Sequence, residues 1–165
     1  MVAFRSARLE EIKTIRALER ASAQRFIGLM DALAADEPSP AAVLAARIAE
    51  DGLIVAVEGE TVAGFVMFRP VEARAYVEQL DVLPAFGGRR IGAALLDAVA
   101  DQARAAGLAG LSLSTFREVP WNAPYYQRLG FVALTALTPG MVEIREAHRA
   151  RGLDEEARVF MVRDV

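Results

Sequence analysis

The sequence has no cysteine and a single histidine, His148. Without thiols there is no disulfide framework, thiolate nucleophile, iron–sulfur cluster or cysteine-based zinc site, and one imidazole does not make a histidine-rich metal site. We therefore expect no bound metal, with a site made of carboxylates alone as the alternative. The chain has 165 residues, a length that buries roughly 68–70% of the unfolded surface on folding without such cross-links. These features predict one domain over residues 1–165.

The sequence also lacks a long apolar run and an excess of positive charge. Although 54% of the residues are hydrophobic, charges such as Asp97 and Asp101 interrupt the apolar stretches well before the roughly 20 residues of a transmembrane helix. Residues 1–20 carry several charges and no apolar core of a secretory signal. The net charge of −3 offers no basic surface to nucleic acid or to an anionic membrane. We expect a cytoplasmic protein with neither partner.

The hydrophobic pattern predicts alternating strands and helices. Ile12, Ile15 and Leu18 share one helical face, which Phe26 or Ile27 would continue. Ser39 and Pro40 are expected to be the N-cap and first residue of the next helix. We expect strands at residues 2–6, 53–57, 61–68, 76–83, 108–115, 131–134 and 158–162, and further helices at 40–50, 89–106, 120–129 and 141–150. This order predicts an α+β fold with a mixed, mostly antiparallel sheet of about six to seven strands, flanked by helices on both faces.

The segment from Leu80 to Gly92, LDVLPAFGGRRIG, is a strand that turns through glycines into a helix. Glycines let a ligand approach the backbone, and the unpaired N–H groups of a helix N-terminus favour a phosphate. Arg89 and Arg90 add positive charge. The glycine spacing fits neither the dinucleotide fingerprint nor the P-loop, so a pyrophosphate of another cofactor is predicted, with a plain strand–helix connector as the alternative.

The segment from Trp121 to Phe131, WNAPYYQRLGF, predicts a short helix that ends in Leu-Gly-Phe. Together the two segments resemble the GNAT superfamily of N-acetyltransferases. The first is similar to its acetyl-coenzyme A (acetyl-CoA) motif, with Val82-Leu83-Pro84 before the glycines, and the second to its N…Y-x-[KR]-x-G-F motif. The order of elements over residues 2–131 matches too. The sequence departs from the family at Gly87, where Arg or Gln is common, and at Arg90, where Gly is common.

The resemblance implies transfer of the acetyl group of acetyl-CoA to a primary amine of a small molecule or peptide, by direct attack in a ternary complex. It also implies Tyr126 as the general acid that protonates the departing thiolate. A backbone N–H near Leu80 to Val82 would receive the charge that develops on the carbonyl oxygen. The residues implied in cofactor binding are Leu80, Val82, Gly87, Gly88, Arg89, Arg90, Gly92, Ala93 and Asn122.

Glu78 is the candidate general base. On a regular strand Tyr76, Glu78, Leu80 and Val82 share one face, so its carboxylate would point to the same side as the residues nearest the thioester. A positioned base typically contributes roughly 10²–10⁴-fold to the rate. The alternative is that Glu78 is only a cross-strand charge partner for an arginine.

Other functions remain open at this stage. The loop would also suit an acyl-CoA-binding sensor with little or no turnover, whereas nucleic-acid binding through Arg89 and Arg90 is disfavoured by the acidic charge balance. A hydrolase that uses His148 is disfavoured because no nucleophile elbow is present, and His148 is expected on a solvated helix. Acceptor recognition in similar proteins points to residues 22–40, with Asp31 and Asp36, and to residues 134–153. A homodimer is possible.

Overall fold

The computed structural model describes residues 1–30 and 37–165, and seven of its strands form one mixed sheet. The strand order is β1-β2-β3-β4-β5-β7-β6. Within the ladders of known register, only β4 with β5 is parallel, and the other pairs are antiparallel. This confirms the predicted fold class. The strands are β1 (Ala3–Ser6), β2 (Leu53–Glu58), β3 (Thr61–Val71), β4 (Arg74–Val82), β5 (Gly110–Phe116), β6 (Val132–Ala133) and β7 (Arg158–Asp164).

Helices and short 3₁₀ turns connect these strands. The helices are α1 (Ile12–Ala23), α3 (Ala41–Ala49), α4 (Ile91–Ala105), α5 (Ala123–Arg128) and α6 (Pro139–Ala150). The 3₁₀ turns are η1 (Leu9–Glu11), η2 (Gln24–Phe26), η3 (Pro84–Phe86) and η4 (Glu155–Ala157). The chain divides into two compact units, one of Met1–Arg69 and Glu78–Ala98 and one of Pro70–Val77 and Val99–Val165. Three elements, β3, β4 and α4, run from one unit into the other.

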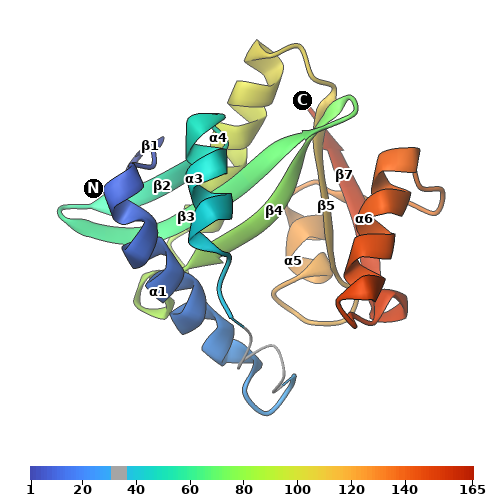
Figure 1. Ribbon diagram of the computed structural model, residues 1–165, viewed down its shortest axis with the longest axis horizontal. Coiled ribbons are helices and arrows are strands. Elements are labelled where there is room, and N and C mark those ends of the chain that lie inside the picture. Colours follow the sequence, from blue (N-terminus) through green and yellow to red (C-terminus); the bar gives the residue numbers. More distant parts are fainter. Residues whose placement is uncertain (31–36) are drawn as a thin grey trace. The chain divides into compact units, whose positions relative to one another are not determined.

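In the first unit, α1 and α3 cover one face of the strands, and Figure 1 shows these two helices side by side. Ile15 of α1 and Leu44 of α3 are fully buried in one cluster with Phe65 of β3. The other face of β3 meets α4, because a Cβ on Gly64 would lie 3.4 Å from Leu95 Cδ1. Alternation along β3 therefore places helices on both faces, as expected from the sequence.

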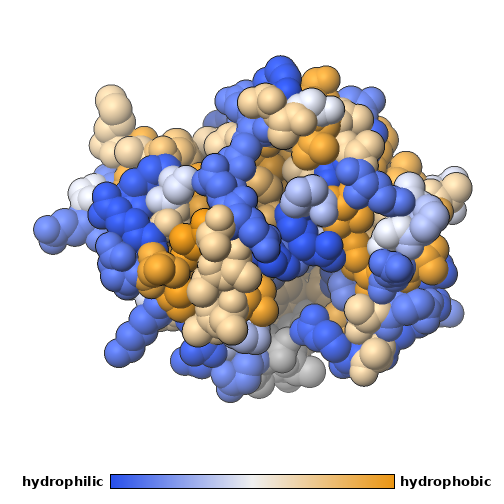
Figure 2. Space-filling view, turned by 45° about the horizontal axis from the view of Figure 1, so that its top comes forward, coloured by the Kyte–Doolittle hydropathy of each residue, from blue (hydrophilic) through white to orange (hydrophobic). Residues whose placement is uncertain are grey.

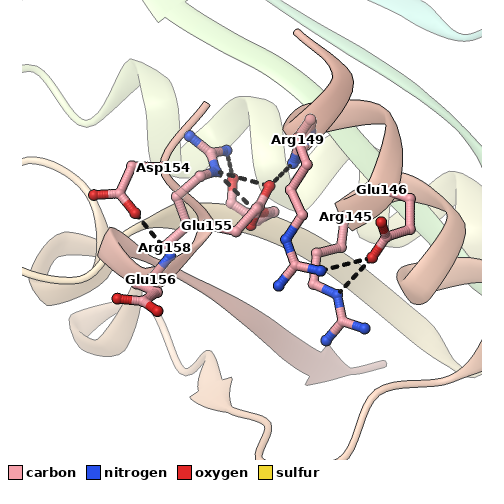
Figure 3. A network of polar contacts seen from close by, with 9 residues as sticks. Arg145, Glu146, Arg149, Asp154, Glu155, Glu156 and Arg158 are labelled. Carbon is pink, nitrogen blue, oxygen red and sulfur yellow. Dashed lines mark hydrogen bonds and ion pairs between the residues drawn. The ribbon is translucent and has the colours of Figure 1, made fainter. Parts of the chain in front are cut away.

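In the second unit, α6 packs on strands β4 and β7. Met141 and Ile144 of α6 are buried against Tyr76, Phe160 and Val162. Figure 3 shows a network of polar contacts among residues of α6, η4 and the start of β7. The guanidinium of Arg158 is among them, with its Nη2 donating to the Ser114 carbonyl oxygen of β5 at 2.9 Å. Apolar contacts thus hold α6 on β4 and β7, and the Arg158 hydrogen bond links β7 to β5.

Three local expectations are wrong. Pro40, not Ser39, is the N-cap of α3, because Ser39 donates its N–H and hydroxyl to Glu19 of α1 at 2.9 and 3.0 Å. Ile27 does not continue the apolar face of α1, since the α-helix ends at Ala23 and Ile27 is exposed. His148 is not a solvated helix residue, because its ring contacts the buried carboxylate of Glu155.

Figure 2 shows hydrophilic residues on the visible face with hydrophobic groups scattered among them. No helix within residues 1–30 and 37–165 has both the length and the hydrophobicity that crossing a membrane requires. Within the same residues, no three His, Asp or Glu side chains gather as metal ligands would.

Candidate functional site

The glycine-rich loop between β4 and α4 adopts a conformation that its sequence requires. Phe86 N–H donates to Leu83 and Gly87 N–H to Pro84, which closes the 3₁₀ turn η3. Gly88 then takes a φ of +75°, and no atom lies within 4 Å of the place where its Cβ would be. Left-handed backbone favours glycine because a Cβ strains it. The loop therefore leaves open space over Gly88, next to the start of α4.

The start of α4 offers the unpaired donors that the sequence predicts. Its first hydrogen bond runs from Ala94 N–H to the Arg90 carbonyl at 3.0 Å, so the N–H groups of Ile91, Gly92 and Ala93 have no acceptor within the helix. These N–H groups and the helix dipole favour an anion. This part of the chain has the backbone chemistry of a phosphate site.

The two arginines at the head of α4 differ in their contacts. Arg89 Nη2 donates to Glu58 at 2.6 Å, and the guanidinium lies 5.2 Å from the centroid of the Phe86 ring. Arg90 is exposed and has a φ of +59°, and its side chain makes no hydrogen bond or ion pair with any residue that the structure describes. Both line a pocket of about 300 Å³ beside Val2 and Phe4. Arg90 is thus a cation without a protein partner in the described chain.

Strand β4 carries an incomplete ladder. Within the described residues, its parallel pairing with β5 covers Arg74–Val77 and leaves Glu78–Val82 outside that ladder. On its β3 side, β4 approaches closely, because a Cβ on Gly64 would lie 2.9 Å from the Asp81 carbonyl oxygen. The second half of β4, with Leu80 and Val82, is therefore the part of the strand where backbone groups are open to a ligand.

Glu78 is held by two arginines. Arg47 of α3 donates Nε to Glu78 Oε1 at 2.5 Å and Nη2 to Oε2 at 3.0 Å, and Arg69 of β3 donates Nε to Oε2 at 3.2 Å. The hydrogen bond with Glu78 raises the pKa of Arg47 above its usual value. Both carboxylate oxygens are thus engaged in charge-assisted bonds, which are among the stronger hydrogen bonds in proteins. The cross-strand arginine expected as the alternative is Arg69.

The expectation that Glu78 and Val82 share one face of β4 is wrong. Glu78 points to Arg47 of α3 and Asp81 to Ser22 of α1, and α1 and α3 pack on the same face. Val82 Cγ2, in contrast, lies 3.3 Å from the position of a Cβ on Gly64, on the face of α4. Residues three apart on one face break the strand alternation. The carboxylate of Glu78 therefore lies on the side of α1 and α3.

Asp81 is a functional candidate that the sequence reasoning missed. Its Oδ1 accepts from Ser22 Oγ at 2.8 Å and lies 3.5 Å from Arg25 Nη2, and its Oδ2 accepts from Gln79 Nε2 at 2.7 Å. The side chain is 4% exposed. Burial raises the pKa of Asp81 from 3.8 to about 6. A charged residue between two apolar ones on a strand expected to be buried was the available signal.

The second unit contains the other predicted site residues. Asn122 is the N-cap of α5, but its side chain forms no capping bond, and its buried Oδ1 accepts no hydrogen bond within the described chain. Tyr126 is 8% exposed and makes edge contacts with Tyr125 and Phe131, at centroid distances of 5.4 and 5.6 Å. Because buried polar atoms are nearly always hydrogen-bonded, the Asn122 Oδ1 is expected to accept a hydrogen bond from a bound molecule.

The predicted site residues therefore fall into two groups. The first unit contains Glu78, on the side of α1 and α3, together with the open half of β4 and the loop before α4. The second unit holds Asn122 and Tyr126 on one short helix. Of the segments expected to recognise the acceptor, residues 31–36, with Asp31 and Asp36, lie outside the described residues, whereas residues 134–153 include α6.

Comparison with known proteins gives one family and many related folds. The sequence profile of the Acetyltransferase (GNAT) family matches residues 15–131. A crystal structure of PaiA N-acetyltransferase from Thermoplasma acidophilum in complex with coenzyme A has a TM-score of 0.75 at 14% identity, and the match covers 100% of this chain and 99% of that chain.

Two further crystal structures show the same similarity. A GNAT family acetyltransferase from Brucella melitensis, in complex with acetyl-CoA, is 25% identical with a TM-score of 0.60, over 81% of this chain and 84% of that one. The ribosomal-protein-S18-alanine N-acetyltransferase from Escherichia coli is 17% identical with a TM-score of 0.68, over 100% and 94% of the two chains.

Proposed function

Since this chain belongs to the Acetyltransferase (GNAT) family, it is an acetyl-CoA-dependent transferase that acts on amines, and we propose that its two motif segments bind the cofactor and move the protons of the transfer. The observation that carries this assignment of residues is the open loop at Gly88, followed by a helix start with unpaired N–H groups. The acceptor is a primary amine of a small molecule or peptide.

The residues present fit acetyl-CoA. The N–H groups of Gly88, Gly92 and Ala93, with the cations Arg89 and Arg90, would hold the pyrophosphate, in the open space over Gly88. Gly87 contributes to the shape of the loop, because a Cβ at this position would lie only 3.3 Å from the Pro84 carbonyl oxygen. The backbone of Leu80 and Val82 would bind the acyl arm, and the orphaned Oδ1 of Asn122 would accept a donor from the cofactor. When bound, acetyl-CoA supplies an activated thioester.

The chain's own groups carry the remaining steps. Glu78 would take the proton of the attacking amine, directly or through water, after one of its guanidinium bonds is released. A backbone N–H near Leu80 to Val82 would receive the charge on the carbonyl oxygen as the amine attacks. The phenol of Tyr126 would donate its proton to the departing sulfur. The attack forms the C–N bond of the amide and breaks the C–S bond of the thioester, so the transfer needs no covalent enzyme intermediate.

Calorimetric titration tests the cofactor site directly. Purified protein is titrated with acetyl-CoA and with coenzyme A at two salt concentrations. We expect micromolar binding that weakens as salt rises, because the phosphates meet exposed cations. Thiol release in the presence of a panel of primary amines then identifies the acceptor class. Absence of binding for both ligands would contradict the proposed site, and binding without thiol release would favour the sensor alternative.

Two conservative variants test the catalytic roles. Glu78→Gln and Tyr126→Phe are each expected to lower turnover by about 10²-fold or more, because each removes one positioned proton carrier. The dissociation constant for acetyl-CoA should stay within about threefold of the wild type, since neither side chain is needed for ground-state binding.

The matched controls are Glu72→Gln, which alters a carboxylate bonded to Thr138, and Tyr125→Phe, which removes the neighbouring hydroxyl. Both controls should turn over at the wild-type rate. If Glu78→Gln behaves like Glu72→Gln, then Glu78 serves only as the partner of Arg47 and Arg69.

We propose the cytoplasm as the site of the reaction, without membrane or nucleic-acid partners. The net negative charge of the sequence supports the absence of anionic partners, both nucleic acid and membrane. A homodimer is a further proposal, and sedimentation of the purified protein at several concentrations tests it.

A further inference from the structure

Among the described residues of the first unit, Asp81 is the one charged residue that is buried, and the proposed chemistry does not use it. It sits between Leu80 and Val82, the two residues proposed to bind the acyl arm. Its side chain reaches away from them, to the end of α1 and to η2, where Ser22 and Arg25 lie. One residue thus connects the proposed cofactor strand to the helix that precedes the proposed acceptor segment.

The polar and charged groups that face Asp81 come from three elements. Ser22 and Glu19 lie on α1, Arg25 on η2, and Gln79 on β4 itself. Ser22 and Gln79 donate to different oxygens of the carboxylate, and among the described residues Arg25, at 3.5 Å, is the one ion-pair partner. Asp81 thus has a partner on each oxygen but, within the described part of the chain, a single cation to offset its buried charge.

The ionised carboxylate of Asp81 lowers the stability of the folded protein at neutral pH. Because its pKa is raised to about 6 by burial, Asp81 contributes less to stability as the pH rises from about 4 through 6, where it becomes ionised in the folded protein. At neutral pH the buried charge is therefore a net cost, which an asparagine would avoid with almost the same shape. A cost of this kind is expected at functional sites.

We propose that Asp81 is a positioning residue for acetyl transfer, whose carboxylate fixes the end of α1 and η2 against the Leu80–Val82 stretch of β4. This inference rests on the proposed function. Asp81 touches neither substrate in this role. It acts through Ser22, Arg25 and Gln79, which it holds on the side of the sheet where Glu78 also lies.

The test compares Asp81→Asn with the wild type and with a matched control, Asp51→Asn. Asp51 also accepts a serine hydroxyl at 2.8 Å, from Ser6, but it is exposed and takes a φ of +58°, which asparagine tolerates. Each protein is examined by urea unfolding, by amide hydrogen exchange, by titration with acetyl-CoA, and by thiol release with the amine panel at pH 5.5 and 7.5.

The expected results distinguish a positioning role of Asp81 from a purely structural role. Asp81→Asn should resist urea at pH 8 at least as well as the wild type, yet amides of Ser22–Phe26 should exchange about tenfold faster or more, because the end of α1 is released. Turnover should fall about tenfold or more with the acetyl-CoA dissociation constant within about threefold. Asp51→Asn should match the wild type in all four measurements.

The pH dependence gives the most specific readout. A carboxyl with a pKa of about 6 is about 97% ionised at pH 7.5 and about 24% at pH 5.5. The ratio of wild-type to Asp81→Asn turnover should therefore fall about fourfold between these two values, since the titration of the amine and of the cofactor cancels in the ratio. A ratio that does not change with pH would contradict the need for an ionised Asp81.

Two other outcomes would overturn the inference. Both are measured on Asp81→Asn, whereas the proposed function is tested on the wild type. Wild-type exchange at Ser22–Phe26 in Asp81→Asn would show that Asp81 does not hold α1. Loss of urea resistance at pH 8 in parallel with turnover would reduce Asp81 to a structural residue. The proposed function itself fails if the wild type does not bind acetyl-CoA or releases no thiol with any amine, and in both cases the exchange comparison still reports on Asp81.

Discussion

At the scale of one residue, His148 shows how folding changes the environment and the pKa of a side chain. It is 14% exposed and contacts Glu155, which is 4% exposed. Burial, followed by the charge of Arg158, lowers the pKa of His148 below its usual value in spite of that carboxylate. The folded protein therefore favours the neutral ring, and protonation opposes folding.

This lowered pKa gives a signed prediction for stability. A group whose pKa is lower in the folded state contributes stability above its unfolded pKa, near 6.5, and loses it as the pH falls. Between pH 7.5 and 5.5 the wild type should lose more urea resistance than His148→Gln. Asp81 acts in the opposite direction, so the difference between variant and wild type is the quantity to measure. An equal loss in both proteins would show that His148 titrates alike in the folded and unfolded states.

Glu78 and Asp81 show how much of the site was predictable at this scale. The residue type at Glu78 was identified from the sequence, but its partners Arg47 and Arg69 come from two other elements. Spacing along β4 gave the wrong face, because it assumes an unbroken alternation. Asp81 was missed because no local pattern shows that Ser22, far away in the sequence, donates to it.

At the scale of the element, the loop between β4 and α4 carries two left-handed residues of different kinds. Gly88 has a φ of +75° and Arg90 a φ of +59°. Glycine adopts this region freely, whereas other residues pay about 1–2 kcal/mol. The loop of this chain therefore holds one left-handed residue that carries a Cβ, Arg90.

The strain predicts opposite effects for two substitutions. Gly88→Ala should lower the free energy of unfolding by about 1 kcal/mol, since no neighbour lies within 4 Å and only the backbone is affected. Arg90→Gly should raise it by about 0.5–1 kcal/mol, because strain is relieved and no bond within the described chain is lost. Urea unfolding without ligand measures both. The same sign for the two variants would show that the loop conformation is not the one described.

The boundaries of the elements were predicted where the signal is local. The strands expected at residues 53–57 and 61–68 are found as β2 and β3, and the helix expected at 89–106 is found as α4, which begins at Ile91 and ends at Ala105. The N-cap of α3 was misplaced by one residue, because Glu19 of α1 takes the donors of Ser39. Long-range partners decide such details, and sequence patterns do not contain them.

At the scale of the whole molecule, the chain forms two compact units that share β3, β4 and α4. The sequence predicts a single domain, and this stays a prediction. Because three elements run through both units, we expect one cooperative unfolding transition. Fluorescence of Trp121 reports on the second unit and amide exchange at Val55 and Phe65 on the first. The two probes should give the same urea midpoint. Separated midpoints would show that the units unfold independently.

The sequence by itself determined the fold class, the loop at Leu80–Gly92 and the family, because hydrophobic period, turn glycines and a motif of fixed spacing are local properties that survive in the chain order. Only the tertiary structure decided that Glu78 is held by two arginines, that Asp81 is buried against α1 and that His148 is neutralised by its surroundings. The physical reason is that charge, burial and hydrogen-bond partners depend on distances in space, which residues far apart in the sequence acquire only when the chain folds.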